Sequence, residues 1–430
     1  MIDALVIFTI LVVLLFLRVP VAFSMASIGI VGFAYYVSWS GVMAMVGRLA
    51  FDTAQSSELS VIPLFVLMGN FITRAGLADE LYTAAYSWIG HRRGGLAMAT
   101  IISCGGFSAV CGSSVATAAT MAKVAMPPMR RFHYADTLAT GAIAAGGTLG
   151  ILIPPSVILV IYGIMTSTDI GALFIAGIIP GILGIIGYNI AISITTRLKP
   201  EIGPPGEKAD WPARMKALGR VWGVLLLFII VIGGIYVGLF TPTEAAGIGA
   251  CGGFFFALFR KTLNLKSLFE LLSDAAQTTA MLFFILIGAM IFSNLMNETG
   301  MPEALGGIVT GLDTHPLVVV FAIMLIYIGL GAVLDSIAMI LLTIPLFFPI
   351  IIGLKLDPVW FGIIVVVVTE ISLITPPVGM NIFVLNTVLP EVGTGTIFRG
   401  VTPFWMVDIV RLTILVLFPA ITLFLPSTIG

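Results

Sequence analysis

Two Pro-Pro steps interrupt apolar stretches of the chain, at Pro154-Pro155 and at Pro376-Pro377, 222 positions further on. Proline has no backbone N–H, and its ring clashes with the preceding helical turn, so each pair is expected to break a helix. Within a membrane, such a break is tolerated only where protein or a water-filled cavity surrounds it. Interrupted apolar segments at corresponding places in two halves predict the binding site of a secondary transporter.

The composition indicates that the chain lies in a membrane. Hydrophobic residues make up 59% of its 430 residues and charged residues only 10%, whereas soluble domains carry about 25% charged residues. The sequence therefore predicts an all-α integral membrane protein. A formal net charge of −1 argues against nucleic acid as a partner.

Apolar runs long enough to cross or enter a bilayer recur along the whole chain. The predicted segments are 2–17, 20–38, 58–74, 94–131, 134–165, 170–197, 218–240, 244–260, 275–299, 315–352, 359–389 and 402–425. Turn residues or a charge divide 94–131 and 315–352 into arms too short to cross, which predicts two re-entrant hairpins. Basic clusters flank only the first hairpin, so the positive-inside rule predicts that the two enter from opposite sides.

The two halves are related by a repeat. At the offset of 222, Pro127 falls on Pro349, and Ser113-Ser114 fall on Asp335-Ser336. Together with the opposite entry of the hairpins, this predicts an inverted-topology duplication. The expected division is 1–93 first scaffold and arm (77–91), 94–165 first transport unit, 166–314 scaffold with a cytoplasmic linker (199–220) and second arm (262–274), 315–390 second transport unit, and 391–430 C-terminal scaffold helix.

The first hairpin carries hydroxyl groups at its predicted tip. Gly112 permits a tight reversal, Ser113 and Ser114 follow it, and Thr117 lies one turn further. Hydroxyls beside unpaired helix-end carbonyls are the oxygen ligands that a hard cation such as Na⁺ prefers. Small residues also pack membrane helices together, and for the segment by itself this alternative stays open. The break at Pro154-Pro155 favours the ion site.

An acid stands in the middle of the second hairpin. Asp335, followed by Ser336, lies in an apolar run, where an unpaired charge costs about 3 kcal/mol or more. It is either a cation ligand or a cap for the following helix, and both interpretations place it at the hairpin tip.

The second broken helix offers both free carbonyls and free N–H groups of the backbone. Thr375 precedes the break and Asn381 follows it. Carbonyls freed by Pro376 and Pro377 suit a cation, whereas free N–H groups after the break suit an anion. Glu370 is a second acid of this helix, either buried or facing an aqueous cavity. The first broken helix is poorer in polar side chains, so backbone carbonyls and Ser156 are its expected contribution.

Other polar residues have structural explanations. Thr241 and Glu244 form a predicted capping box, and Asp136, Asp274 and Asp408 are assigned to helix starts or surface contacts. No lone intramembrane arginine is identified as a carboxylate clamp. The sequence shows neither a phosphate loop nor a serine triad nor a metal-binding motif, so an enzyme is not predicted.

Four runs of sequence together resemble the large membrane subunit of TRAP (tripartite ATP-independent periplasmic) transporters, the DctM-like family. They are GGFSAVCGSSVATAA (105–119), IPPS (153–156), FTPTEAAG (240–247) and TPPVGMN (375–381). The resemblance covers essentially the whole chain. It implies an elevator-type, Na⁺-coupled importer of an organic acid, such as a sialic acid or a dicarboxylate, in the bacterial inner membrane. The implied partners are a small four-helix membrane subunit and a periplasmic substrate-binding protein.

The resemblance also implies where ions and substrate bind, and no organic cofactor is expected. Two or more Na⁺ ions are expected at Gly112, Ser113, Ser114 and Pro154, and at Asp335, Ser336, Thr375 and Pro376. The expected substrate contacts are Ser114, Thr117, Ser156, Pro377 and Asn381. The alternative is a self-sufficient Na⁺/carboxylate symporter that needs no binding protein.

Overall fold

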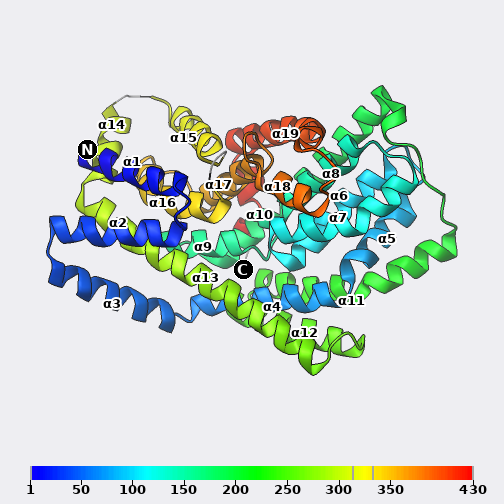
Figure 1. Cartoon of the computed structure of the whole chain (residues 1–430), viewed down its shortest axis with the longest axis horizontal. Coiled ribbons are helices and arrows are strands. Elements are labelled where there is room, and N and C mark those ends of the chain that lie inside the picture. The colour runs from blue at the N-terminus through cyan, green and yellow to red at the C-terminus, as the bar shows by residue number, and fades with distance from the viewer. Residues whose placement is uncertain (1, 312–313, 332–333, 429–430) are drawn as a thin grey trace.

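The computed structural model describes residues 2–311, 314–331 and 334–428, which form an elongated bundle of helices (Figure 1). The helices up to residue 198 are α1 (Ile2–Phe16), α2 (Val21–Tyr36), α3 (Trp39–Gln55), α4 (Val61–Arg74), α5 (Leu77–Ile89), α6 (Gly95–Cys111), α7 (Ser114–Arg131), α8 (Asp136–Thr148), α9 (Val157–Thr166) and α10 (Ile170–Leu198). Those that follow are α11 (Trp211–Tyr236), α12 (Pro242–Phe259), α13 (Leu265–Glu298), α14 (Met301–Gly311), α15 (Pro316–Gly331), α16 (Ser336–Gly353), α17 (Pro358–Leu373), α18 (Met380–Val388), α19 (Thr394–Leu417) and α20 (Ala420–Leu423). The 3₁₀ turns are η1 (Glu58–Ser60), η2 (Leu149–Ile151), η3 (Pro200–Ile202) and η4 (Pro426–Thr428).

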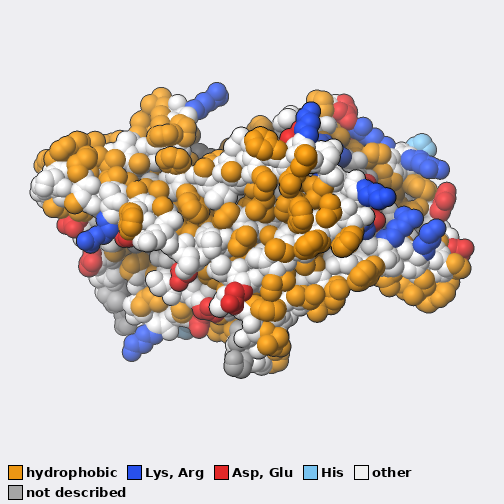
Figure 2. Space-filling model, turned by 90° about the horizontal axis from the view of Figure 1, so that it is seen from below, with side chains coloured by type: hydrophobic (Ala, Val, Ile, Leu, Met, Phe, Trp, Pro, Cys, Tyr) orange, Lys and Arg blue, Asp and Glu red, His pale blue; other side chains and the backbone are white. Residues whose placement is uncertain are grey.

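Several helices have the length and composition of membrane spans. Among the described residues, the helices α10, α11, α12, α13, α16 and α19 qualify, and α3 with η1 and α4, bent by 59°, would add one more. Apolar side chains cover much of the face shown in Figure 2, and the Lys and Arg side chains visible there gather mostly toward its right-hand end. This separation of apolar and basic surface agrees with the predicted all-α membrane protein.

Both Pro-Pro steps break helices, as predicted. α8 continues through η2 to Ile151, and α9 begins only at Val157. α17 ends at Leu373, and α18 begins at Met380. Each interrupted helix therefore has helix-end carbonyls before its break and helix-start N–H groups after it, and these groups lack the partners that a continuous helix would give them.

Each predicted hairpin region contains two successive helices. α6 ends at Cys111 and α7 begins at Ser114, with Gly112 between them at φ +62°, a backbone conformation that glycine adopts without strain. α15 ends at Gly331 and α16 begins at Ser336; residues 332–333 lie outside the described part. In Figure 1 the labels of α6 and α7 lie in the right-hand half of the molecule, and those of α15 and α16 lie in the left-hand half.

The boundaries of the helices repeat with the offset of 222 found in the sequence. The matching first and last residues are 114 with 336, 131 with 353, 136 with 358, 151 with 373 and 166 with 388. The second arm of each hairpin and both parts of each broken helix therefore have counterparts of nearly the same extent. The secondary structure supports the predicted duplication.

Some helices differ from the predicted segments. α3 lies outside the predicted spans. α13 is one continuous helix of 34 residues, so the predicted arm 262–274 and the span 275–299 are not separate elements. The helical N-cap at Asn264 explains where this helix starts, because its side chain accepts a hydrogen bond from the amide of Ser267 at 2.8 Å.

N-terminal caps also define the starts of α11 and α12. Asp210 accepts a hydrogen bond from the amide of Ala213 at 3.1 Å, so α11 begins inside the predicted linker 199–220 and shortens it. At the start of α12, the amide of Thr241 donates to Glu244 at 2.9 Å and the amide of Glu244 donates to Thr241 at 3.3 Å. The predicted capping box is confirmed.

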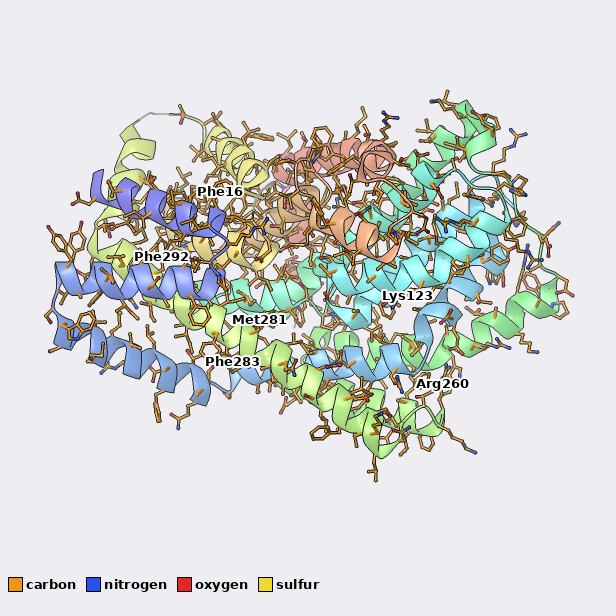
Figure 3. The ribbon with its side chains drawn as sticks, in the orientation of Figure 1. Phe16, Lys123, Arg260, Met281, Phe283 and Phe292 are labelled. Atoms are coloured by element: carbon orange, nitrogen blue, oxygen red, sulfur yellow. The ribbon has the colours of Figure 1, made fainter. Side chains whose placement is uncertain are left out.

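Arg260 connects the end of α12 to the corner between α4 and α5. Its guanidinium pairs with Glu80 at 2.6 Å, donates to the carbonyl of Ala75 at 3.2 Å and lies 4.4 Å from the centre of the Phe256 ring. Figure 3 shows Arg260 at the lower edge of the molecule, beside the end of α12. The start of α5, the predicted first arm, is thus attached to the end of α12.

α8 and α19 pack in close contact at Gly400, and this contact can be tested with one methyl group. A Cβ on Gly400 would lie 2.0 Å from the carbonyl oxygen of Thr137. We predict that Gly400→Ala forces the helices apart and costs about 1–3 kcal/mol, as overpacking typically does. Gly395→Ala on the same helix is the matched control, because nothing lies within 4 Å of its Cβ position. Thermal unfolding in detergent should separate the two variants, and equal melting temperatures would contradict this contact.

Candidate functional site

A cavity of about 370 Å³ lies where the tips of the two hairpins meet. The first hairpin contributes Gly112, Ser113 and Ser114 to its lining, and the second contributes Asp335 and Ser336. Five of the eight residues predicted to bind Na⁺ are thereby brought together from positions more than two hundred residues apart.

The opposite wall of the cavity comes from the long helices. Asn70 of α4 and Thr278 and Met281 of α13 line it. Figure 3 shows Met281 near the middle of α13, at the centre of the molecule. α4 approaches the first hairpin tip closely, because a Cβ on Gly69 would lie 3.0 Å from the carbonyl oxygen of Val110. The cavity is therefore bounded by the hairpins on one side and by α4 and α13 on the other.

The lining of the cavity follows the internal repeat. Five pairs of lining residues are related by the offset of 222, namely 113 with 335, 114 with 336, 115 with 337, 151 with 373 and 158 with 380. Equivalent positions of the two repeats thus face the same space. The cavity lies at the place where the two halves of the molecule meet.

Helix starts and helix ends converge on this cavity. α7, α9, α16 and α18 begin at residues 114, 157, 336 and 380, and all four line it. α6, η2 and α17 end at residues 111, 151 and 373, which also line it. Helix starts carry unpaired N–H groups and partial positive charge, whereas helix ends carry unpaired carbonyls. The arrangement can accommodate an anion beside a cation.

The two hairpin tips use equivalent residues as helix caps. Ser113 accepts a hydrogen bond from the amide of Ala116 at 3.4 Å. One oxygen of Asp335, Oδ1, accepts from the amides of Ile337 and Ala338 at 3.0 and 2.9 Å. Asp335 therefore does cap α16. Its second oxygen keeps its acceptor capacity, so the cap is compatible with cation binding.

α18 begins without a side-chain cap. Gly379 precedes it at φ +59°, and its lack of a side chain leaves the amides of Met380 and Asn381 without a local acceptor. At the equivalent start of α9, Ser156 accepts from the amide of Leu159 at 3.3 Å. The second broken helix is therefore the better provided with free N–H groups.

The first break lies directly behind the first hairpin tip. A Cβ on Gly112 would lie 2.9 Å from the carbonyl oxygen of Pro155. Pro154 is buried and does not line the cavity, and Ser156 is fully buried, with its hydroxyl donating to the carbonyl of Ile151. These predicted site residues support the tip from behind rather than face the cavity.

The residues of the second break lie outside the cavity lining. Pro376 and Pro377 are exposed, and Thr375 is half-buried. The indole of Trp405, on α19, donates a hydrogen bond to the Thr375 hydroxyl at 3.0 Å. Their predicted role in binding Na⁺ and substrate stays a prediction.

Two further predicted substrate contacts are buried within the helix bundle. Thr117 lies one turn into α7, beside Cys111. Asn381 is fully buried, and its amide nitrogen donates to the carbonyl of Ala144 at 3.0 Å. Of the predicted substrate residues, Ser114 is the one that lines the cavity.

Sequence reasoning missed a buried ion network close to the second break. Arg411 of α19 pairs with Glu370 of α17 and with Asp408 at 2.9 Å, and all three side chains are at least 96% buried. The hydroxyl of Tyr188, on α10, donates to Asp408 at 2.6 Å and lies 3.3 Å from that of Thr148, at the end of α8. The network therefore joins both broken helices to α10 and α19.

The prediction that Asp408 lies near a helix start is wrong. The predicted segment began at residue 402, but α19 continues through Pro403 and starts at Thr394. Asp408 consequently lies in mid-helix, one turn before Arg411. An acid and a base three residues apart share a helix face, and their occurrence inside an apolar run was the signal that could have revealed this pair. Asp274 is also within a helix, α13, where it is exposed.

Comparison with known proteins identifies the family. The pattern of the family described as "Tripartite ATP-independent periplasmic transporter, DctM component" matches residues 8–421. The chain belongs to this DctM family. It is 39% identical over 382 residues to the C4-dicarboxylate TRAP transporter large permease protein DctM of Pseudomonas aeruginosa, covering 88% of each chain. It is 34% identical to the protein of the same name from Rhodobacter capsulatus, over 100% of both chains.

Other comparisons widen the range of relatives and support the fold. The chain is 32% identical to the sialic acid TRAP transporter large permease protein SiaM of Vibrio cholerae, covering 96% of each. Two solved structures share its fold: the YdaH transporter of Alcanivorax borkumensis (TM-score 0.63, 14% identity, 90% of each chain) and MtrF of Neisseria gonorrhoeae (TM-score 0.60, 11% identity, 89% of this chain and 84% of that one). This DctM-family chain is a multi-pass membrane protein whose relatives are permeases rather than enzymes.

The buried network predicts unequal effects of removing its charges. Arg411→Met leaves Glu370 and Asp408 as unpaired buried carboxylates, so we predict a loss of about 3–5 kcal/mol in unfolding free energy. Glu370→Gln keeps a hydrogen-bonding group and leaves Arg411 paired with Asp408, so its cost should stay near 1 kcal/mol. Thermal unfolding of the detergent-purified variants measures both. Arg131→Met, at the exposed end of α7, is the control; losses of the same size in the two network variants would be evidence against this assignment.

Proposed function

We propose that the chain is the large membrane subunit of a TRAP transporter that imports an organic acid together with Na⁺. The observation that carries the proposal is the convergence of helix starts and helix ends on the cavity between the hairpin tips. The partial positive charge at the starts of α7, α9, α16 and α18 favours a carboxylate, and the uncapped start of α18 offers it free N–H groups. Carbonyls at the ends of α6, η2 and α17, together with Asp335, favour a cation.

The charges around the cavity explain why the anion should need the cation. Among the described residues that line it, Asp335 is the one carboxylate, and neither lysine nor arginine is present. Arg411 is held by its two carboxylates and lies outside the lining. A substrate anion would be repelled by Asp335 until Na⁺ binds beside it. Na⁺ binding then creates the site for the carboxylate, which is the condition for coupled transport.

The proposed moving unit contains the two hairpins and the two broken helices, which enter the membrane from opposite sides and move as an elevator against the other helices. We extend it to α10 and α19, because the ion network and the tight contact at Gly400 join these helices to α8 and α17. The arms are α5 and the first part of α13. This division differs from the one expected from the sequence, in which α10 and α19 belong to the scaffold.

The membrane potential sets a requirement on the number of ions. One charge crossing 100 mV gains about 2.3 kcal/mol, or close to fortyfold accumulation. A monoanion that travels with one Na⁺ moves no net charge and gains nothing from the potential. Two or more Na⁺ ions per monoanion are therefore part of the proposal.

The names of the relatives guide the choice of substrate and partners. They include C4-dicarboxylate and sialic acid transporters, so the proposed substrate is a carboxylate of this range. The proposed partners are a small four-helix membrane subunit and a periplasmic substrate-binding protein, in the bacterial inner membrane. The self-sufficient symporter is not favoured, because these relatives are named as large permease proteins of TRAP transporters.

Reconstitution into proteoliposomes tests the function. We expect the chain, together with the small subunit and the substrate-loaded binding protein, to accumulate radiolabelled organic acid when Na⁺ is high outside. Accumulation should increase with an inside-negative potential. Replacing Na⁺ by K⁺ should abolish it. Uptake at full rate in K⁺ would exclude the coupling, and full uptake by the chain alone would favour the self-sufficient symporter.

Asp335 can be tested separately as a cap and as a charge. Asparagine caps helices about as well as aspartate, so Asp335→Asn should fold normally while losing the charge that attracts Na⁺. We predict at least a tenfold rise in the Na⁺ concentration that gives half-maximal uptake, corresponding to about 1.4 kcal/mol. Asp357→Asn is the matched control, because Asp357 caps α17 through the amides of Val359 and Trp360 and is exposed outside the cavity.

Asp335→Ala completes this series. Loss of the cap should reduce the unfolding free energy by about 1 kcal/mol and thereby lower the melting temperature. The rise in the Na⁺ concentration that gives half-maximal uptake should remain. If Asp335→Asn leaves Na⁺ dependence unchanged and Asp335→Ala only destabilises the protein, then Asp335 is a cap and nothing more.

A further inference from the structure

A second cavity, of about 350 Å³, opens at one end of the contact between α10 and α19. Lys199, directly after α10, and Arg399, in the second turn of α19, line it together with the hydroxyl-bearing Thr137. Neither basic group forms an ion pair with any of the residues that the structure describes. Both side chains are exposed. The cavity therefore presents two uncompensated positive charges.

α10 and α19, which border this cavity, run antiparallel and in close contact. A Cβ on Gly184 would lie 2.1 Å from Nη1 of Arg411, and one on Gly187 would lie 2.6 Å from the side chain of Val407. Increasing residue numbers on α10 thus meet decreasing numbers on α19. Gly184 and Gly187 let α10 approach α19 closely. The outer faces of the two helices therefore form one continuous surface.

Each helix carries an exposed apolar stripe on this surface. The stripes have four-residue spacing and consist of Ile186, Ile190 and Ile194 on α10 and Met406, Val410 and Ile414 on α19. By helical geometry, the two stripes of this antiparallel pair fall on the same side of the contact. On α10 the stripe continues to Leu198, which lines the cavity itself. An exposed apolar surface therefore leads directly away from the basic cavity. The cavity and the two stripes together are called the groove.

We propose that this groove binds an anionic phospholipid, with its phosphate between Lys199 and Arg399 and its acyl chains along the two stripes. Basic cavities between membrane helices, on the side where Lys and Arg collect, suit anionic head groups. The continuity of the apolar stripe with the basic cavity selects a lipid over a free phosphate ion, because a small ion would leave the stripe uncovered. A zwitterionic head group would bring its own positive charge beside the two basic side chains and bind less well.

Binding of defined lipids to the purified full-length chain tests this proposal. The chain is delipidated in detergent and titrated with phosphatidylglycerol, phosphatidylcholine or inorganic phosphate, and the bound lipid is counted by native mass spectrometry. At about 1 kcal/mol for each basic residue, loss of two charges should weaken phosphatidylglycerol binding about thirtyfold. The variant is therefore Lys199→Gln with Arg399→Gln. The control, Lys208→Gln with Lys216→Gln, removes two exposed positive charges away from the groove and should stay within about twofold of the unchanged chain.

The apolar part of the groove needs its own variant. Ile190→Ser with Val410→Ser keeps the basic cavity and removes apolar contact, so it should weaken phosphatidylglycerol but leave any phosphate effect unchanged. Equal binding of phosphatidylglycerol and phosphatidylcholine, or unchanged phosphatidylglycerol binding in the Lys199 and Arg399 variant, would overturn the proposal. Complete displacement of phosphatidylglycerol by inorganic phosphate would also overturn the proposal. Loss of the bound lipid when the small membrane subunit is co-purified would reassign the groove to a protein contact.

Discussion

The interior of a membrane offers no water to a broken helix, and this constraint shapes the centre of the molecule. Every N–H and C=O group freed by a break must find a partner within the protein or face a cavity that holds one. The chain meets this requirement twice, with Pro154-Pro155 packed behind one hairpin tip and with α18 beginning uncapped at the edge of the central cavity. The helix termini that cost free energy elsewhere in a bilayer are thus concentrated around one cavity, which is the proposed binding site for ions and substrate.

The same constraint separates the charges of the protein into two kinds. Arg411, Glu370 and Asp408 are buried but partnered, and they hold α17, α19 and α10 together. Asp335 is half-buried at the cavity and is partnered through one oxygen with the amides of its own helix. A partnered network is suited to keeping a body rigid, whereas a carboxylate with spare acceptor capacity is suited to binding a cation. In the proposed mechanism, rigid packing and cation binding therefore belong to different acids.

Much of this architecture could be predicted from the sequence, because its signals are local. The Pro-Pro pairs predict the breaks, Thr241 with Glu244 predicts a cap, and the offset of 222 predicts which segments correspond. What could not be predicted depends on long-range packing. The cavity lining includes α4 and α13, which no motif indicated, and it excludes Pro376 and Pro377, which the motif had suggested. Asp408 was misplaced because the predicted span began at residue 402, whereas α19 starts at Thr394 and continues through Pro403. A proline inside a membrane helix is tolerated when neighbouring helices satisfy the freed groups.

The internal repeat is symmetric in its backbone and asymmetric in its chemistry. Ser113 and Asp335 are equivalent caps, but only the second carries a charge. The two Pro-Pro steps differ as well, because the first is buried and the second is exposed. A duplicated fold thus provides two matching sets of helix ends around one cavity, while substitution at the tips makes the halves unequal. In the proposed mechanism this inequality makes the tip with Asp335 the preferred site for Na⁺. The substrate anion then binds beside the bound Na⁺ and not between two uncharged hairpin tips.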